Sequence, residues 1–365
     1  MPVAAISSKY RVGILGATGA VGQRFLQLLE GHPWFEVTAL GASERNAGKT
    51  YKDAANWKIS ADIPEMAKGL VILDCSDTQA FLPLVDLLFS GLDSSVAGTV
   101  EKSFAEAGVP VFSNAKNYRM AEKVPILLPT ANPDHVDIVT HQDTFSKGGF
   151  IVTNANCSST GLTIALKPIF EAFGITTFIA TTLQAISGAG YPGLSAMDMT
   201  DNCVPFISGE EDKIETEPCK ILGKPKGDGT IQFASMKGCA MCHRVAVSDG
   251  HVVSVSLKLE NPPSGDKAAA VVEALRKYRV HPDVEVLPSC PPQAVVVRDE
   301  PDRPQPRLDR MAGGGQASVV GRVRECPVFD VRMVTLSHNT IVGAAGGSLL
   351  NAELAVKRGY VKHRQ

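Results

Sequence analysis

The chain has 365 residues, of which 44% are hydrophobic and 20% charged, and its formal net charge is −2. This length predicts two domains, and the composition is ordinary for a globular protein. The near-neutral balance, without a long run of like charge, argues against nucleic acid or an anionic membrane surface as the partner.

Targeting and membrane signals are missing from the sequence. The first ten residues lack the basic and apolar regions of a secretory signal, and no apolar run reaches the roughly 18–20 residues that cross a bilayer. The eight cysteines are scattered, unlike the framework of a short secreted chain. We therefore expect a cytoplasmic protein with free thiols.

The first predicted element is a short apolar strand at 11–15, which runs into the glycine-rich stretch GATGAVG. Apolar residues at 21, 25, 28 and 29 then have the spacing of an amphipathic helix. A strand, a glycine turn and a helix in this order are typical of a dinucleotide site, because glycines let the backbone approach a pyrophosphate at the helix N-terminus. The alternative is a turn without a ligand, since the spacing G-x-x-G-x-x-G is not the common one. The cofactor-binding residues expected here are Gly16, Thr18, Gly19, Ala20 and Val21.

Further strands are predicted in FEVTAL, GLVILDCS, VPVFSN and FIVTNANC, with helical segments such as TQAFLPLVDLLFSGL between them. This alternation predicts a parallel, doubly wound sheet. The second strand ends in GASERNAGK, where Ser43, Arg45 and Lys49 offer a hydroxyl and two cations. They favour the 2′-phosphate of NADP over the ribose of NAD, with Glu44 as the counter-evidence.

The predicted strand FIVT leads through NAN to Cys157, which begins a predicted helix with one apolar face. The dipole and the N–H groups at a helix N-terminus favour a thiolate and can hold an oxyanion. Such a thiolate can attack an acyl carbonyl; the alternative is a cysteine that only packs the turn. The expected proton partner is His251, which follows the turn SDG and opens an alternating strand.

The stretch GCAMCHRV contains a C-x-x-C-H pattern. Haem attachment would require export, and no second Cys–His cluster completes a four-ligand zinc site. We therefore expect no metal here and interpret Cys239 and Cys242 as packing residues beside Arg244.

Eight segments, in order and over nearly the whole chain, resemble the archaeal and fungal branch of the aspartate-β-semialdehyde dehydrogenase family. They are GATGAVGQRF, ASERNAGKTY, TNANCSSTGL, TLQAISGAGYPG, GEEDKIETEPCKILG, CHRVAVSDGH, DRPQPRLDR and NTIVGAAGGSLLNAEL. The resemblance implies that NADPH reduces L-aspartyl 4-phosphate to L-aspartate 4-semialdehyde through a thioacyl intermediate on Cys157. This reaction belongs to the biosynthesis of threonine, methionine, isoleucine and, where that route is used, lysine.

The resemblance also implies roles for individual residues. His251 is the acid/base catalyst, Arg244 binds the α-carboxylate of the substrate, and Glu210 binds its ammonium group. Lys213 and Arg119 bind phosphate, Asn156 and Gln184 orient the substrate, and Ser187, Gly188 and Asn339 approach NADP.

The fold class implied is α/β: an NADP-binding Rossmann domain plus a mixed α/β catalytic and dimerisation domain. The first is expected over 1–156 with the C-terminal helix at about 343–365, and the second over 157–342, including an exposed Pro- and Gly-rich loop at 288–316. Family members are homodimers or homotetramers. Two alternatives stay open: an N-acetyl-γ-glutamyl-phosphate reductase, whose substrate has no cation for Glu210, and a catalytically silent NADP-binding redox sensor.

Overall fold

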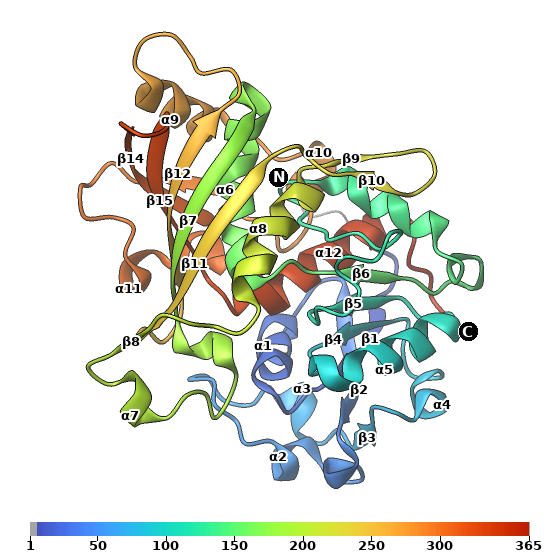
Figure 1. The fold of residues 1–365 in the computed structure, drawn as a ribbon. Coiled ribbons are helices and arrows are strands. Elements are labelled where there is room, and N and C mark those ends of the chain that lie inside the picture. Colours follow the sequence, from blue (N-terminus) through green and yellow to red (C-terminus); the bar gives the residue numbers. More distant parts are fainter. Residues whose placement is uncertain (1–5, 365) are drawn as a thin grey trace.

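The computed structural model describes residues 6–364, which build two α/β domains around two separate sheets (Figure 1). Residues 1–5, which belong to the predicted first domain, and Gln365 at the end of the predicted C-terminal segment lie outside the described residues. In the part of the chain that is described, no helix is long and apolar enough to cross a membrane.

The first sheet is parallel, with the strand order β3-β2-β1-β4-β5-β6. The strands are β1 (Tyr10–Leu15), β2 (Phe35–Ala42), β3 (Ile72–Asp74), β4 (Leu87–Ser90), β5 (Val111–Ser113) and β6 (Ile151–Thr153). The winding reverses between β1 and β4, and a doubly wound sheet binds its ligand at such a point. The glycine turn follows β1 and therefore lies there.

One prediction for this sheet is wrong. The segment TQAFLPLVDLLFSGL is helical only over α4 (Thr78–Phe81), and its second half contains the central strand β4. Pro83 cannot continue a helix, and the apolar run behind it is buried on both faces between β1 and β5. A fully buried strand has no alternation that would distinguish it from a helix.

Helices cover both faces of the first sheet. α1 (Ala20–Leu29) and α12 (Gly346–Lys357) share one hydrophobic core with the sheet, while α4 and α5 (Ser94–Glu106) contribute to the core on the other face. The last helix of the chain thus packs with the first (Figure 1).

The second sheet is mixed and has the order β13-β14-β15-β12-β7-β11-β8. Its strands are β7 (Ile175–Gln184), β8 (Cys203–Val204), β11 (Lys237–Val245), β12 (His251–Leu259), β13 (Val295–Val297), β14 (Ser318–Glu325) and β15 (Val331–Ser337). α6 (Cys157–Phe173), α8 (Glu210–Ile221) and α9 (Lys267–Lys277) share a core with this sheet. The other face of β7 and β11 leaves Ile179, Leu183 and Met241 exposed.

The remaining elements are short. They are α2 (Tyr51–Ala54), α3 (Glu65–Lys68), α7 (Ala196–Met199), α10 (Pro282–Glu285), α11 (Pro306–Asp309) and the hairpin of β9 (Lys224–Pro225) and β10 (Ile231–Gln232).

The predicted exposed loop at 288–316 is only partly a loop, because it contains β13 and α11. The carboxylate of Asp309 is buried and accepts hydrogen bonds from Arg298 Nε at 3.0 Å and Arg303 Nε at 2.6 Å. These pairings between residues of one segment order a stretch whose composition alone indicates a loop.

Candidate active site

A cysteine and a histidine meet where the two sheets adjoin. Cys157 is the first residue of α6, which residues 154–156 connect to β6, the last strand of the first sheet, and His251 is the first residue of β12. Cys157 Sγ lies 3.2 Å from His251 Nε2. The pair that the sequence predicts is therefore formed.

The other ring nitrogen of His251 fixes the tautomer. The backbone N–H of Ala185 donates to Nδ1 at 3.0 Å, so the neutral imidazole carries its proton on Nε2, facing the sulfur. Burial, and next the charge of Arg244, lowers the pKa of His251 to about 3. The ring is thus neutral at physiological pH and presents an N–H group to Cys157.

The predicted activation of Cys157 by its helix N-terminus is not what this structure shows. Asn156 is the N-cap, and its Oδ1 accepts the N–H groups of Ser158 at 3.0 Å and Ser159 at 3.2 Å. Those two N–H groups are therefore taken and are not available to a thiolate or an oxyanion. Protein atoms surround the partly exposed thiol closely enough that desolvation raises the pKa of Cys157 to about 12. Glu210 raises this pKa further, while the nearby cations oppose it.

The buried carboxylate of Glu210 contacts three of the other predicted substrate-binding residues. It accepts hydrogen bonds from Lys213 Nζ at 2.6 Å, from Asn156 Nδ2 at 2.9 Å and from Gln184 Nε2 at 3.3 Å. Burial would raise the pKa of Glu210, but Lys213 and these hydrogen bonds together hold it below its ordinary value. The structure thus provides an ionised carboxylate in a nearly closed site, which suits a cationic group of a ligand.

Arg244 lies close to the same pair. Its Nη1 donates to the carbonyl of Ala185 at 2.7 Å, and its side chain is buried. A Cβ on Gly188 would lie 2.8 Å from Arg244 Nη1 and 3.1 Å from His251 Cε1. The missing side chain of Gly188 therefore makes room for both residues.

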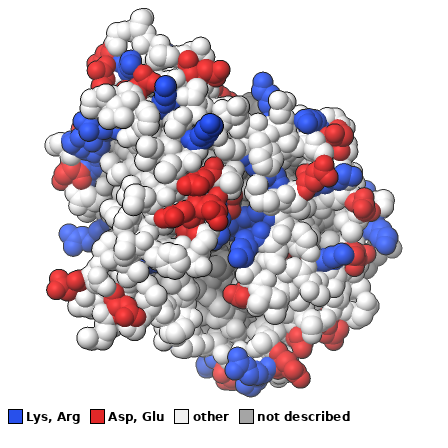
Figure 2. All heavy atoms as spheres, viewed as in Figure 1, with Lys and Arg blue, Asp and Glu red and all other residues white. Residues whose placement is uncertain are grey.

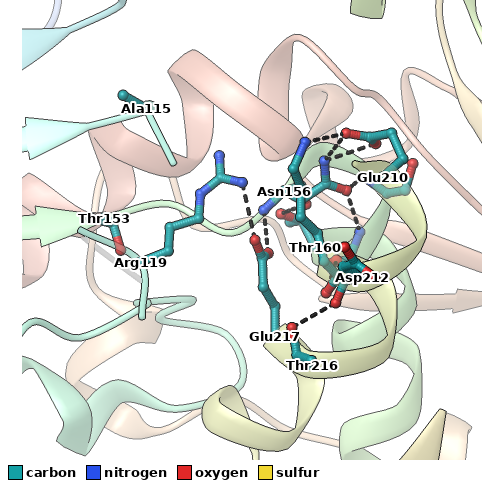
Figure 3. Close-up of polar contacts among 12 residues, drawn as sticks. Ala115, Arg119, Thr153, Asn156, Thr160, Glu210, Asp212, Thr216 and Glu217 are labelled. Carbon is teal, nitrogen blue, oxygen red and sulfur yellow. Dashed lines mark hydrogen bonds and ion pairs between the residues drawn. The ribbon is translucent and has the colours of Figure 1, made fainter. Parts of the chain in front are cut away.

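Arg119 reaches the site from the first domain. Figure 3 shows the carboxylate of Glu217, on α8, in contact with both the guanidinium group of Arg119, through an ion pair, and the backbone N–H of Asn156. In the space-filling view, acidic side chains gather over α8, with basic side chains directly beside them (Figure 2). All predicted catalytic and substrate-binding residues are buried or partly buried in this one region.

A cavity of about 700 Å³ lies beside this region and fits a dinucleotide. Residues of both domains line it, including Ala20 of α1 and Ser187. Gly19, the N-cap of α1, supplies no side-chain cap, which leaves the first N–H groups of the helix to a pyrophosphate. Gly16 has a φ of 75°, and a Cβ on Gly22 would lie 2.3 Å from the carbonyl oxygen of Gly16, so this turn requires both glycines.

The other predicted cofactor residues have different surroundings. Ser43 and Arg45 are exposed just beyond the end of β2, where a 2′-phosphate could reach them. Asn339 is buried; its Oδ1 accepts the N–H of Gly250 at 2.8 Å, and its Nδ2 donates to Ser187 Oγ at 2.8 Å. Asn339 therefore connects the turn before His251 with Ser187, which lines the cavity.

The sequence interpretation missed several residues that line the cavity, among them Arg24, Lys58, Tyr191 and Asp249. Arg24 could have been found, because it follows Ala20 by four residues on the same face of α1. Lys58 had no such signal: its Nζ lies 4.7 Å from the ring centroid of Tyr191, a contact between segments far apart in the sequence.

The C-x-x-C-H pattern lies on β11. Cys242 is buried in the core and Cys239 is exposed, because residues three apart on a strand point to opposite faces. These two thiols therefore cannot bind one metal ion together.

The chain is similar to known proteins over nearly its whole length. Residues 11–139 match the semialdehyde dehydrogenase NAD binding domain, and residues 166–342 match the semialdehyde dehydrogenase dimerisation domain. The aspartate-semialdehyde dehydrogenase of Candida albicans is 50% identical over 356 residues, which cover 94% of this chain and 97% of that protein. The one from Archaeoglobus fulgidus is 46% identical over 353 residues, or 96% of this chain and 98% of that protein.

Solved structures agree with these matches. The crystal structure of the C. albicans aspartate semialdehyde dehydrogenase with NADP has a TM-score of 0.89 and 48% identity, and it covers 96% of this chain and 100% of its own. Aspartate semialdehyde dehydrogenase II of Vibrio cholerae, complexed with ASA, has a TM-score of 0.75 and 26% identity, with 96% and 99% covered.

Proposed function

The chain belongs to the aspartate-semialdehyde dehydrogenase family, and we propose that it reduces L-aspartyl 4-phosphate with NADPH to L-aspartate 4-semialdehyde and phosphate. This assigns it to the biosynthesis of threonine, methionine and isoleucine, and of lysine where that route is used. The observation that carries the proposal is the contact of Cys157 with His251 beside the buried, ionised Glu210.

The chemistry takes place on Cys157. Its sulfur adds to the acyl carbon, the bond from this carbon to the phosphate oxygen breaks, and a thioester remains. The thiol proton leaves with the phosphate, and the Nε2–H group of His251, which faces the sulfur, stabilises the attacking thiolate as a hydrogen-bond donor. NADPH, when bound in the cavity, supplies the hydride that reduces the thioester carbon. The carbon–sulfur bond then breaks, the aldehyde leaves, and a proton from water restores the thiol.

Each charged group of the substrate would bind to a side chain of opposite charge. Arg244 would bind the α-carboxylate, and Glu210, oriented by Asn156 and Gln184, would bind the ammonium group. Lys213 and Arg119 would bind the phosphate. This set favours aspartyl phosphate over an N-acetylated substrate, because an acetylated amine would leave the charge of Glu210 buried without a cationic partner from the ligand. The nucleophile and the histidine in contact with it likewise argue against a silent sensor.

For NADP(H), we propose Gly16, Thr18, Gly19, Ala20 and Val21 at the pyrophosphate and Ser43 and Arg45 at the 2′-phosphate. Ser187, Gly188 and Asn339 would border the nicotinamide end. The N-cap of α1 and the exposed residues just beyond β2 support this assignment. The proposed first domain comprises 1–156 with 343–365, and the proposed catalytic domain 157–342; the shared core of α1 and α12 supports this division.

The chain is a homo-oligomer that associates through its dimerisation domain. We propose a homodimer whose subunits pack the outer faces of their second sheets together, since Ile179, Leu183 and Met241 are exposed there. A cytoplasmic location is proposed as well, because the exposed thiols of Cys203 and Cys239 suit a reducing compartment.

The reverse reaction tests the proposed function. The purified protein should reduce NADP with aspartate 4-semialdehyde over many turnovers only when inorganic phosphate is present, as followed by nicotinamide absorbance. N-acetylglutamate 5-semialdehyde should give no turnover under the same conditions. Turnover with the acetylated aldehyde alone would identify the protein as an N-acetyl-γ-glutamyl-phosphate reductase. No turnover with either aldehyde would favour the catalytically silent redox sensor.

A further inference from the structure

One buried carboxylate, Glu217, has no role in the proposed function yet contacts two parts of the site. Its Oε1 accepts a hydrogen bond from Arg119 Nη1 at 3.0 Å, and its Oε2 accepts one from the backbone N–H of Asn156 at 2.5 Å (Figure 3). The side chain is 2% exposed. Glu217 therefore cannot bind a substrate itself, but it joins the proposed phosphate arginine to the residue just before Cys157.

Glu217 lies on the same face of α8 as the substrate-binding pair. Glu210, Lys213, Glu217 and Lys220 are spaced by three, four and three residues, which places them on one face of a helix. The first two form the ion pair near the substrate, and the other two are buried further along. One helix thus carries both the groups proposed to bind the substrate and those that could position its partners.

Lys220 holds the loop that carries Arg119. Its Nζ donates to the carbonyls of Arg119 at 2.7 Å, Ala121 at 2.8 Å and Val124 at 2.8 Å, so all three of its N–H groups are used by the backbone. Lys220 fixes the backbone of Arg119 while Glu217 fixes its guanidinium group.

Arg119 keeps donors for a ligand. Nη1 binds Glu217 and Nη2 donates to the carbonyl of Asn114 at 2.8 Å, while Nε is buried and has no hydrogen-bond partner among the described residues. Each Nη group carries a second N–H, and these two remain for a ligand. The two bonds to protein atoms leave little freedom for the guanidinium plane.

We propose that Glu217 is a positioning residue that orients Arg119 for phosphate, relative to Cys157, and that Lys220 anchors the same loop. The inference rests on the proposed function, because it takes Arg119 as the phosphate ligand. Phosphate enters only in one half of the reverse reaction, in which it attacks the thioester carbon and the carbon–sulfur bond breaks. The first half, from aldehyde and NADP to the thioester, needs no phosphate. The effect of Glu217 should therefore fall on one half alone.

The test uses Glu217→Gln in the full-length oligomer. A glutamine oxygen can still accept the N–H of Asn156, while the amide NH2 group cannot accept one from Arg119. We expect the KM for phosphate in the reverse reaction to rise about tenfold to a hundredfold, the range for loss of a charge-assisted hydrogen bond. The KM for aspartate 4-semialdehyde should stay within about twofold, and the first turnover without phosphate should still give one NADPH per chain. Asp212→Asn removes an exposed acid from the same helix and should match the wild type.

A double-mutant cycle separates positioning from folding. In an Arg119→Gln background, where the ion pair is already absent, Glu217→Gln should change the KM for phosphate by less than about twofold. An unchanged KM for phosphate in Glu217→Gln, or an equal effect in both backgrounds, would overturn the proposal. If the wild-type protein itself had no activity in the reverse reaction, the proposed function would be contradicted instead.

Discussion

Cys157 Sγ and His251 Nε2 lie 3.2 Å apart, and the imidazole carries its proton on the nitrogen that faces the sulfur. Burial lowers the pKa of His251 to about 3 and raises the pKa of Cys157 to about 12, so both groups are neutral in the free protein at physiological pH. The pair resembles a resting thiol beside a hydrogen-bond donor, not a thiolate–imidazolium pair.

The rate at which Cys157 reacts with an alkylating reagent should therefore keep rising with pH, as expected for a thiol with a raised pKa. Its alkylation by iodoacetamide, measured by peptide mass spectrometry, should accelerate about tenfold per pH unit between pH 7 and 9, because only the thiolate reacts. The exposed Cys203 reports reagent activity in the same digest. A rate that levels off above pH ~6.5, the ordinary pKa of histidine, would show a thiolate–imidazolium pair and contradict this description.

Gly188→Ala should reduce kcat/KM by about a hundredfold while the protein stays folded, because the new Cβ would displace Arg244 or His251, and a displacement of about 1 Å can cost this much. Gly227→Ala is the matched control, since no atom lies within 4 Å of its added Cβ. Steady-state kinetics of both variants, with circular dichroism as the check on folding, decide the point. Equal activities would remove the spatial role of Gly188.

Arg45→Ala tests the proposed 2′-phosphate site beyond β2. The KM for NADP should rise about tenfold or more through loss of a charge-assisted contact, while the KM for NAD should stay within about twofold. Lys52→Ala, which removes an exposed cation nearby on α2, should change neither value. A parallel rise for both cofactors would place Arg45 elsewhere in the cofactor site.

The protein should lose stability in mild acid, and His135 should account for a measurable share. Desolvation lowers the pKa of this buried histidine to about 4, while the unfolded chain has the ordinary value of about 6.5. Since the unfolded chain binds the extra proton first, the contribution of His135 is fully present above pH ~6.5 and falls away as the pH drops toward 4.

His135→Gln isolates that contribution. Between pH 7.5 and 5 the wild type should lose about 2 kcal/mol more unfolding free energy than the variant, as measured by urea denaturation. An equal loss in both proteins would show that His135 titrates normally in the folded state.

The sequence predicts the parts of the site that local patterns encode. Cys157 is predicted at a helix start because an apolar strand, a polar turn and an apolar helix face surround it within one short stretch. His251 is predicted at a strand start because a glycine turn precedes an alternating run. Both residues then meet because α6 packs against β12, while the pairing of β12 with β7 places Ala185 beside the histidine ring.

The parts that the sequence does not predict depend on contacts across the fold. The raised pKa of Cys157 arises from surrounding protein atoms, and no local signal reports such burial. The sequence pattern around Glu217 indicates a charged, solvated helix. In the fold, Arg119 and the backbone of Asn156, which belong to other segments, contact its carboxylate. The sequence predicts a helix where β4 lies, because a strand buried on both faces lacks the alternation of apolar and polar residues that identifies a strand.

The central claim is that Cys157 becomes covalently acylated, and the first turnover tests it most directly. Protein mixed with aspartate 4-semialdehyde and NADP, without phosphate, should release one NADPH per chain in a rapid burst. Intact-mass spectrometry should then find one added aspartyl group per chain, and peptide mapping should place it on Cys157. Cys157→Ala should bind NADP as the wild type does and give neither burst nor adduct. A burst that persists in Cys157→Ala, or an adduct on another residue, would contradict the account.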